Sequence, residues 1–256
     1  MISVENKIKY AVKLFNKKIL AGNLMKSVAI FRHVPIEGPG YFATFLDNNH
    51  IPWQLIKIDA GEKPPTSIDA FSGLVFMGGP MSVNDDLPWI APTLNLIRQA
   101  IANDTPVLGH CLGGQLMAKA MGGVVTNSVK EMGWGEVSVA NNPIARAWFD
   151  DCSAFDTFHW HGETFSLPEG ATCILSSPYC ENQAFAMGIH LGMQCHVEMT
   201  DRMVRDWCSV GAEELAGLNE PSVQSIAEIE KNLPERIAQS NLIAERLYTK
   251  WIIALK

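Results

Sequence analysis

Short apolar runs alternate with amphipathic stretches through the first half of the chain. Short apolar runs predict buried strands, whereas apolar positions three and four residues apart predict helices that bury one face. The predicted strands are residues 27–32, 53–58, 73–77 and 106–109, and the predicted helices are residues 38–49, 92–103 and 115–121. This alternation favours a parallel sheet with helices on both faces.

The pattern changes in the second half of the chain. Residues 124–195 suggest further short strands, including a hairpin of residues 185–188 and 191–195 that turns near Ile189 and His190. After Thr200, which is placed to cap a helix, apolar positions follow helical spacing, and Pro234 opens a last helix. We expect an α/β fold: a central, mostly parallel sheet flanked by helices, with a helical C-terminal extension. The expected parts are residues 1–24, 25–198 and 199–256.

The first 26 residues are basic, although the chain as a whole is acidic. They hold six lysines against Glu5, while the chain has a net charge of −7. They lack the continuous apolar core of a secretory signal. Residues 25–31 resemble a natural protein start that leads directly into a strand. We therefore expect residues 1–24 to be an extension without a role in catalysis.

Composition narrows the class of protein further. Of the 256 residues, 47% are hydrophobic and 18% are charged, which is typical of a folded domain. The negative net charge argues against nucleic acid as the main partner, and no apolar run approaches the length of a membrane-spanning helix. The six cysteines are too few and too scattered for a disulfide scaffold, so we expect free thiols and a cytoplasmic location.

The strongest chemical signal is a G-x-C-x-G pattern at residues 109–113, between a predicted strand and a predicted helix. A nucleophile at such a junction occupies a sharp turn, and small flanking residues leave it uncrowded. Cys111 would stand at a helix N-terminus, where partial positive charge favours a thiolate. The backbone N–H of Leu112 is placed to stabilise an oxyanion. A buried core cysteine with glycines that serve packing is the alternative interpretation.

Two further segments complement this thiol. The turn at residues 78–80, Gly-Gly-Pro, follows a predicted neighbouring strand, and the Gly79 N–H is a candidate second oxyanion donor. His196 and Glu198 are two residues apart, so in a strand they share a face, with Cys195 and Val197 turned into the packing. A cysteine nucleophile needs such a base and a group that orients it.

Together, the G-x-C-x-G-G-Q, Gly-Gly-Pro and Q-x-H-x-E segments resemble class I glutamine amidotransferases, over about residues 26–198. The resemblance is greatest to the amidotransferase part of GMP synthase and its stand-alone relatives. It implies a flavodoxin-like sheet and hydrolysis of a γ-glutamyl amide through a thioester. The implied catalytic residues are Cys111 as nucleophile, His196 as base and Glu198 as the orienting acid. The implied oxyanion donors are Gly79 and Leu112. The implied glutamine-binding residues are Gln115, His161, Gly162 and Glu163.

The resemblance to this family extends to two further segments. Residues 160–163, Trp-His-Gly-Glu, resemble a loop that closes over the amino-acid end of glutamine, and residues 130–134 resemble the K-E-x-G-W signature of the stand-alone branch. Two positions depart from the family pattern: Cys195 stands where an aromatic residue is usual, and Val197 stands where proline is frequent. Neither is a catalytic side chain, so the expected triad is intact.

Three functions remain open at this stage: ammonia release from glutamine, hydrolysis of γ-glutamyl peptides, and a non-catalytic binding role. An α/β-hydrolase is disfavoured because in that fold the acid precedes the histidine. The residues after Glu198 hold no glycine-rich phosphate loop, so we expect that this chain alone neither binds ATP nor forms an amidated product. We expect no cofactor and no metal, and we leave open a separate acceptor or synthetase subunit.

Overall fold

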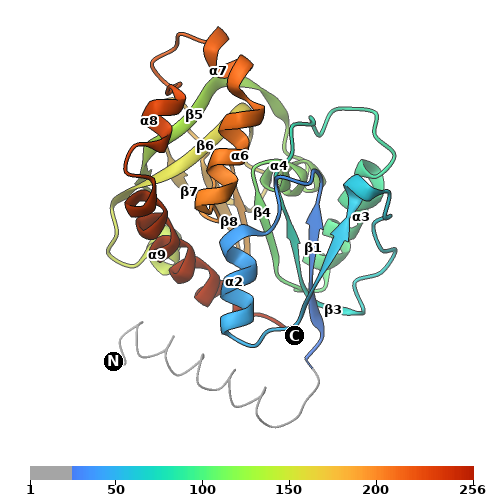
Figure 1. The fold of residues 1–256 in the computed structure, drawn as a ribbon. Helices are drawn as coiled ribbons and strands as arrows, with labels where there is room; N and C mark the ends of the chain where they lie inside the picture. Colours follow the sequence, from blue (N-terminus) through green and yellow to red (C-terminus); the bar gives the residue numbers. More distant parts are fainter. Residues whose placement is uncertain (1–24) are drawn as a thin grey trace.

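The computed structural model describes residues 25–256 (Figure 1). Its strands are β1 (Ser27–Arg32), β2 (Trp53–Lys57), β3 (Phe71–Phe76), β4 (Val107–His110), β5 (Val125–Val139), β6 (Ala154–Phe165), β7 (Thr172–Ser176), β8 (Ala184–Met187) and β9 (His190–Met193). Its helices are α2 (Gly40–Asn48), α3 (Ile90–Ala102), α4 (Leu112–Ala120), α5 (Pro143–Phe149), α6 (Asp201–Val210), α7 (Ala212–Gly217), α8 (Ile226–Glu230) and α9 (Leu233–Ile252), with a single 3₁₀ turn, η1 (Ile58–Ala60). The predicted non-catalytic extension, residues 1–24, lies outside the described residues.

These strands form one sheet in the order β2-β1-β3-β4-β9-β8-β7-β5-β6. The pairs β1–β2, β1–β3, β3–β4 and β4–β9 are parallel, as the alternation of strands and helices predicts. Because the carboxyl ends of parallel strands share one edge, the turn after β3 lies beside the turn after β4. The predicted α/β fold is confirmed.

The other half of the sheet is antiparallel. It pairs β9 with β8, β8 with β7, β7 with β5, and β5 with β6. The hairpin of β8 and β9 was expected, but β5 and β6 have 15 and 12 residues, longer than the short strands that the pattern suggests. The sheet is therefore mixed, and β9 joins its parallel half to its antiparallel half.

Two apolar clusters pack on opposite faces of the sheet. One includes Leu96 of α3 and Leu116 of α4, and the other includes Phe42 of α2 and Trp251 of α9. In Figure 1, α2 and α9 lie on one side of β1 and β3, while α3 lies on the other. The C-terminal helix thus covers one face of the parallel half of the sheet.

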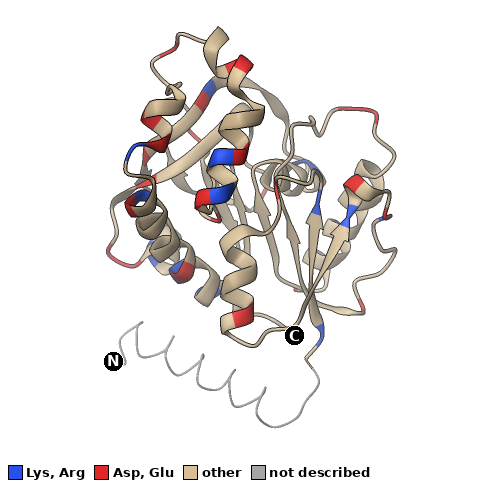
Figure 2. Cartoon of the chain, in the orientation of Figure 1, with Lys and Arg blue, Asp and Glu red and all other residues tan. Residues whose placement is uncertain are grey.

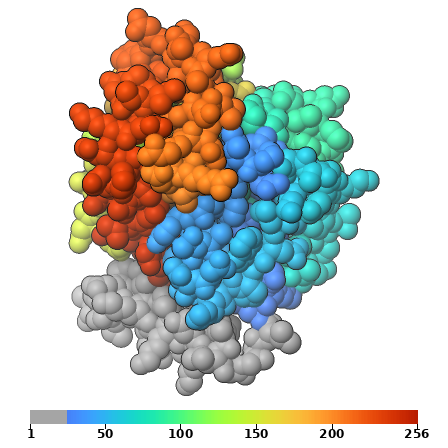
Figure 3. Space-filling model, in the orientation of Figure 1, coloured from blue at the N-terminus to red at the C-terminus, as the bar shows by residue number. Residues whose placement is uncertain are grey.

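Helices α6 to α9 cover one side of the molecule as a continuous surface that reaches α2 (Figure 3). Met203 and Trp207 of α6 contribute to a third apolar cluster, together with Trp134 of β5 and Phe158 of β6. Charged residues lie mainly on the helices and loops, whereas the central strands carry few of them (Figure 2). Within residues 25–256, no helix is long and apolar enough to span a bilayer. The cytoplasmic location stays a prediction.

Candidate active site

Cys111 lies at the turn between β4 and α4, as predicted. Its φ of 50° and ψ of −107° are strained for a non-glycine residue. Two backbone hydrogen bonds fix the turn: the Cys111 N–H donates to the Met193 carbonyl at 2.8 Å, and the Gln115 N–H donates to the Cys111 carbonyl at 3.0 Å. Gly113 lets α4 approach β3, because a Cβ there would overlap the Phe76 carbonyl oxygen. These contacts hold the Cys111 thiol at the N-terminus of α4.

The turn after β3 lies against this helix start. An added Cβ at Gly79 would lie 2.9 Å from Leu112 Cδ2 and 3.2 Å from the Cβ of His33. The buried His33 ring holds the turn, since its Nδ1 lies 3.0 Å from the Met77 carbonyl oxygen. Burial lowers the pKa of His33 to about 4, so this ring stays neutral at ordinary pH. The two predicted oxyanion donors, Gly79 and Leu112, are thus neighbours.

His196 and Glu198 lie in the segment after β9. The expectation that both residues lie on one face of a strand is wrong, because β9 ends at Met193. His196 forms only an isolated bridge with Phe158 of β6. The side chains nevertheless meet, with His196 Nδ1 2.7 Å from Glu198 Oε1. Cys195 and Val197 are buried in the apolar core, as expected. Backbone bonds between His196 and Phe158 replace the predicted strand pairing.

Neighbouring segments hold both members of this pair. The Glu198 carbonyl accepts the Tyr41 N–H at 2.8 Å, and Gly40 lets the start of α2 come this close, with a φ of 50°. The ring of Trp207 from α6 packs edge-on against the His196 ring, with centroids 4.9 Å apart. Both side chains are at most 1% exposed. The imidazole is therefore held by β6 and α6, and the acid by α2.

Electrostatics favour a charged histidine beside a charged acid. Burial alone would lower the pKa of His196, but the Glu198 carboxylate and the nearby Cys111 thiol raise it well above its usual range. Burial would raise the pKa of Glu198, but His110 and His196 hold it well below its usual range. Within the described residues, His196 Nε2 is buried without a hydrogen-bond partner. That nitrogen is free to exchange a proton with a substrate.

A glutamine side chain that the sequence interpretation left without a role contacts the Cys111 thiol. Gln194 Nε2 donates to Cys111 Sγ at 3.4 Å, and Gln115 Nε2 donates to Gln194 Oε1 at 3.2 Å. Gln115, predicted to bind glutamine, thus also supports the thiol through Gln194. The position of Gln194 in the Q-x-H-x-E segment is the signal that could have identified it.

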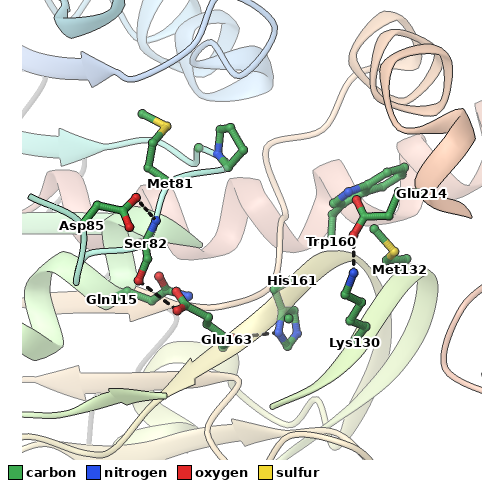
Figure 4. Close-up of a pocket in the computed structure, with 13 residues that line it drawn as sticks. Met81, Ser82, Asp85, Gln115, Lys130, Met132, Trp160, His161, Glu163 and Glu214 are labelled. Atoms are coloured by element: carbon green, nitrogen blue, oxygen red, sulfur yellow. Dashed lines mark hydrogen bonds and ion pairs between the residues drawn. The ribbon is translucent and has the colours of Figure 1, made fainter. Parts of the chain in front are cut away.

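A pocket of about 450 Å³ adjoins the thiol (Figure 4). Cys111 Sγ lies 3.9 Å from the carbonyl oxygen of Trp160, one of the pocket residues. Polar residues from the loop after β3, from α4, from β5 and β6 and from α7 line it, including Ser82, Asp85, Gln115, Lys130, Glu163 and Glu214. Lys130 of β5 and Glu214 of α7 form an ion pair at its edge. Groups of both signs suit a substrate that carries an amine and a carboxylate.

Residues 160–163 line this pocket, but they do not form the loop that was expected. They belong to β6, where β5 pairs with them around a register shift between Asn127 and Glu131. Glu163 Oε1 accepts a hydrogen bond from Ser82 Oγ at 2.9 Å, and His161 Nδ1 lies 3.1 Å from the Glu163 carbonyl oxygen. Gly162 lies against the Lys130 side chain. A strand rather than a mobile loop thus presents His161, Gly162 and Glu163.

Behind His161 is a buried polar cluster. Glu131, His161 and Cys180 place one potential metal-ligand atom each within 4.8 Å of the others. However, both Glu131 oxygens already accept hydrogen bonds at 2.7 Å, from Ser177 Oγ and from Gln183 Nε2. A network of hydrogen bonds accounts for the carboxylate, which also lies 3.2 Å from His161 Nε2. That no metal binds here stays a prediction.

Glu37 is a second carboxyl group beside His196, and the sequence interpretation did not include it. An added Cβ at Gly78 would overlap Glu37 Oε2 and would lie 3.3 Å from His196 Cε1. Burial, with a smaller contribution from Glu198, raises the pKa of Glu37 to about 7, although His196 opposes the shift. Glu37 comes from the loop between β1 and α2, far from the motifs in sequence.

Comparisons with known proteins fit this geometry. A solved glutamine amidotransferase from Methylobacillus flagellatus superposes with a TM-score of 0.88 at 48% identity, over 91% of this chain and 96% of that one. The glutamine amidotransferase-like protein YfeJ of Salmonella typhimurium is 29% identical over 77% of this chain and 86% of its own length. Gamma-glutamyl peptidase 3 of Arabidopsis thaliana is 28% identical, over 59% of this chain and 65% of its own length.

GMP synthases are also among the relatives, as the sequence resemblance predicts. The enzyme of Wolbachia pipientis is 33% identical over 47% of this chain, and the match spans 24% of that longer protein. The family model described as glutamine amidotransferase class-I matches residues 47–203, which include Cys111, His196 and Glu198. The chain therefore belongs to the class I glutamine amidotransferase family.

Proposed function

We propose that this protein hydrolyses the side-chain amide of glutamine, with Cys111 as nucleophile, His196 as base and Glu198 as the group that orients the base. One observation carries the proposal: a strained cysteine at a helix N-terminus adjoins a buried histidine–carboxylate pair and a polar pocket. Structural cysteines need neither a strained backbone nor a charged histidine beside them.

In the first step, the Cys111 thiolate attacks the amide carbon, and a C–S bond forms as the carbonyl π electrons move to oxygen. The backbone N–H groups of Gly79 and Leu112 stabilise that oxyanion, and one such donor contributes about 2.7–4 kcal/mol in comparable sites. The C–N bond then breaks, and the His196 imidazolium gives its proton to the departing nitrogen. Ammonia and a γ-glutamyl thioester result.

In the second step, neutral His196 takes a proton from water, and the oxygen attacks the thioester carbon. When the C–S bond breaks, glutamate leaves, and the thiolate–imidazolium pair is restored. Glu198 stays ionised throughout, since its low pKa lets it stabilise the imidazolium without taking the proton. In this proposal Gln115, His161, Gly162 and Glu163 bind the amino-acid end of the substrate.

A second candidate is hydrolysis of γ-glutamyl peptides by the same thioester chemistry. One relative is named gamma-glutamyl peptidase, and that name favours this candidate. The two reactions differ only in the leaving amine. They are separated by comparing ammonia release from glutamine with amine release from γ-glutamyl dipeptides, using the purified chain without ATP. Faster release from the dipeptides would favour the peptidase, and no release from either would contradict both.

An ammonia-supplying role would require a separate acceptor or synthetase subunit. The GMP synthase relative of Sulfurisphaera tokodaii is named as one subunit of its enzyme, and that name supports such an arrangement. Negligible turnover of the isolated chain that rises on adding a cell extract would favour a partner of this kind. We propose that the chain alone forms no amidated product, so ATP-dependent amidation by the purified chain would contradict this part.

A further inference from the structure

Glu198 contacts two histidines, and the proposed triad uses only one of them. Oε1 lies 2.7 Å from His196 Nδ1, whereas Oε2 lies 3.0 Å from Nδ1 of His110, the last residue of β4. All three side chains are at most 1% exposed. Oε2 and His110 Nδ1 are within ion-pair distance but do not form a well-aligned hydrogen bond, and neither atom has a hydrogen-bond partner within residues 25–256.

The other ring nitrogen of His110 contacts the C-terminal helix. Tyr248 of α9 places its hydroxyl 3.4 Å from His110 Nε2, with the two rings edge-on and their centroids 6.1 Å apart. Phe42 and Phe45 of α2 pack around the Tyr248 ring. Burial and the nearby Glu198 charge raise the pKa of Tyr248 well above its usual range, so the phenol keeps its proton and can donate it.

These contacts define one proton arrangement. An ionised carboxylate only accepts hydrogen bonds, so the His110 nitrogen beside Glu198 must carry a proton. The Tyr248 hydroxyl donates to the opposite nitrogen, which must then be the acceptor. A His110 ring with its proton on Nδ1 and its lone pair on Nε2 satisfies both contacts and brings a second donor to Glu198.

We propose that His110 is a positioning residue that holds Glu198 for His196, and that Tyr248 selects the required His110 tautomer. The inference rests on the proposed function, because orientation of His196 matters only if His196 is the base. Without His110, Glu198 Oε2 would be a buried acceptor with no partner, so the carboxylate would turn and the His196 ring would lose its fixed orientation. The C-terminal helix thereby contributes to the active site without touching the substrate.

A role in packing alone is the competing explanation, and three variants separate the two. His110→Asn keeps a donor close to the Nδ1 position, His110→Leu keeps the bulk without a donor, and Tyr248→Phe keeps the ring but removes the hydroxyl. We expect His110→Leu to lower kcat about 10-fold or more with KM within about 2-fold, because His110 touches no substrate. His110→Asn should recover most of kcat, and Tyr248→Phe should lower it by about 2- to 5-fold.

A second readout does not depend on turnover. The rate of Cys111 alkylation by iodoacetamide at a fixed pH reports the thiolate, which the His196 imidazolium stabilises. Alkylation should slow in His110→Leu and stay near the wild-type rate in His110→Asn. If the wild type hydrolyses neither glutamine nor a γ-glutamyl peptide, the proposed function fails, and the alkylation series still decides the role of His110.

Thermal unfolding of each variant shows whether folding is retained. If His110→Leu does not fold, the comparison of His110→Asn and Tyr248→Phe with the wild type replaces it. Equal kcat and alkylation rates in His110→Leu and His110→Asn would overturn the proposal, as would a loss confined to KM.

Discussion

The parallel and antiparallel halves of the sheet contribute differently to the site. The parallel half supplies the strained Cys111 turn and the Gly79 turn from the ends of adjacent strands, β4 and β3. The antiparallel half supplies the pocket residues Lys130 and Glu163, which lie in long strands and pair with other side chains. In the proposed reaction, turns in the parallel half place the nucleophile and the oxyanion donors, whereas most of the proposed substrate-binding residues lie on strand surfaces of the antiparallel half. Variants in the two halves should differ in which kinetic constant they change.

The largest effect is expected at Cys111. Cys111→Ala should lower turnover at least about 10⁴-fold, because no other group can form the thioester. Melting temperature should change little, since the side chain loses only one atom. Cys152→Ala, a change at a partly exposed cysteine outside the site, is the matched control. Full activity in the alanine variant would contradict the role of Cys111.

His196 and Glu198 should rank next. His196→Ala removes the only proposed base, whereas Glu198→Gln leaves a histidine that is poorly oriented and less basic. We expect the loss in kcat to be about 10- to 100-fold greater for His196→Ala. Steady-state kinetics of both variants measures the ratio. Equal losses would mean that Glu198 does more than orient the base.

Variants of the pocket residues in the antiparallel half should change KM more than kcat. Glu163→Gln removes a charge that faces the proposed amino group of the substrate, so KM should rise about 10-fold while kcat stays within about 3-fold. Glu169→Gln, on the exposed loop that follows β6, is the control. A loss in kcat instead would show that the strand surface also affects the chemistry, and the contrast between the two halves would break down.

The smallest effect concerns Glu37 and stability. Its pKa is about 7 in the folded protein and ordinary when unfolded, so the folded state binds a proton more tightly between about pH 4.5 and 7. The free energy of unfolding should therefore fall as the pH rises through this window. Glu37→Gln should remove the decline, which makes the variant more stable than wild type at pH 8 by on the order of 2 kcal/mol.

Urea unfolding at pH 5 and pH 8 tests this expectation, with the exposed Glu220→Gln as control. An equal pH dependence in wild type and Glu37→Gln would show that the Glu37 carboxyl group is no harder to ionise in the folded protein.

The parts of the site that the sequence predicts are those encoded locally. The Cys111 turn follows from neighbouring glycines, and the Q-x-H-x-E segment identifies His196 and Glu198 as a pair, although the strand expected there does not form. The contact of Glu198 with His110 and the proximity of Glu37 to His196 join segments that are distant in the chain, and no periodicity relates such segments. They appear only when the sheet is assembled.

The misjudged strands have a local cause. In β5 the burial alternates only in part, and residues 131–134 are buried consecutively, which interrupts the period of two that identifies a strand. Gly133, with a φ of 112°, lies within that stretch. The pattern therefore suggests several short strands where one long, irregular strand forms.

The place of β9 in the sheet bears on how the protein folds. Because β9 pairs with β4 on one side and β8 on the other, its docking joins the two halves and brings His196 towards Cys111. The hairpin of β8 and β9 is local, but the pairing of β4 with β9 joins segments distant in sequence, and such pairings form late because chain closure costs entropy before contacts repay it. During refolding, activity should therefore return with the slowest structural phase. Chains in which β9 has not yet docked would therefore hold Cys111 and His196 apart.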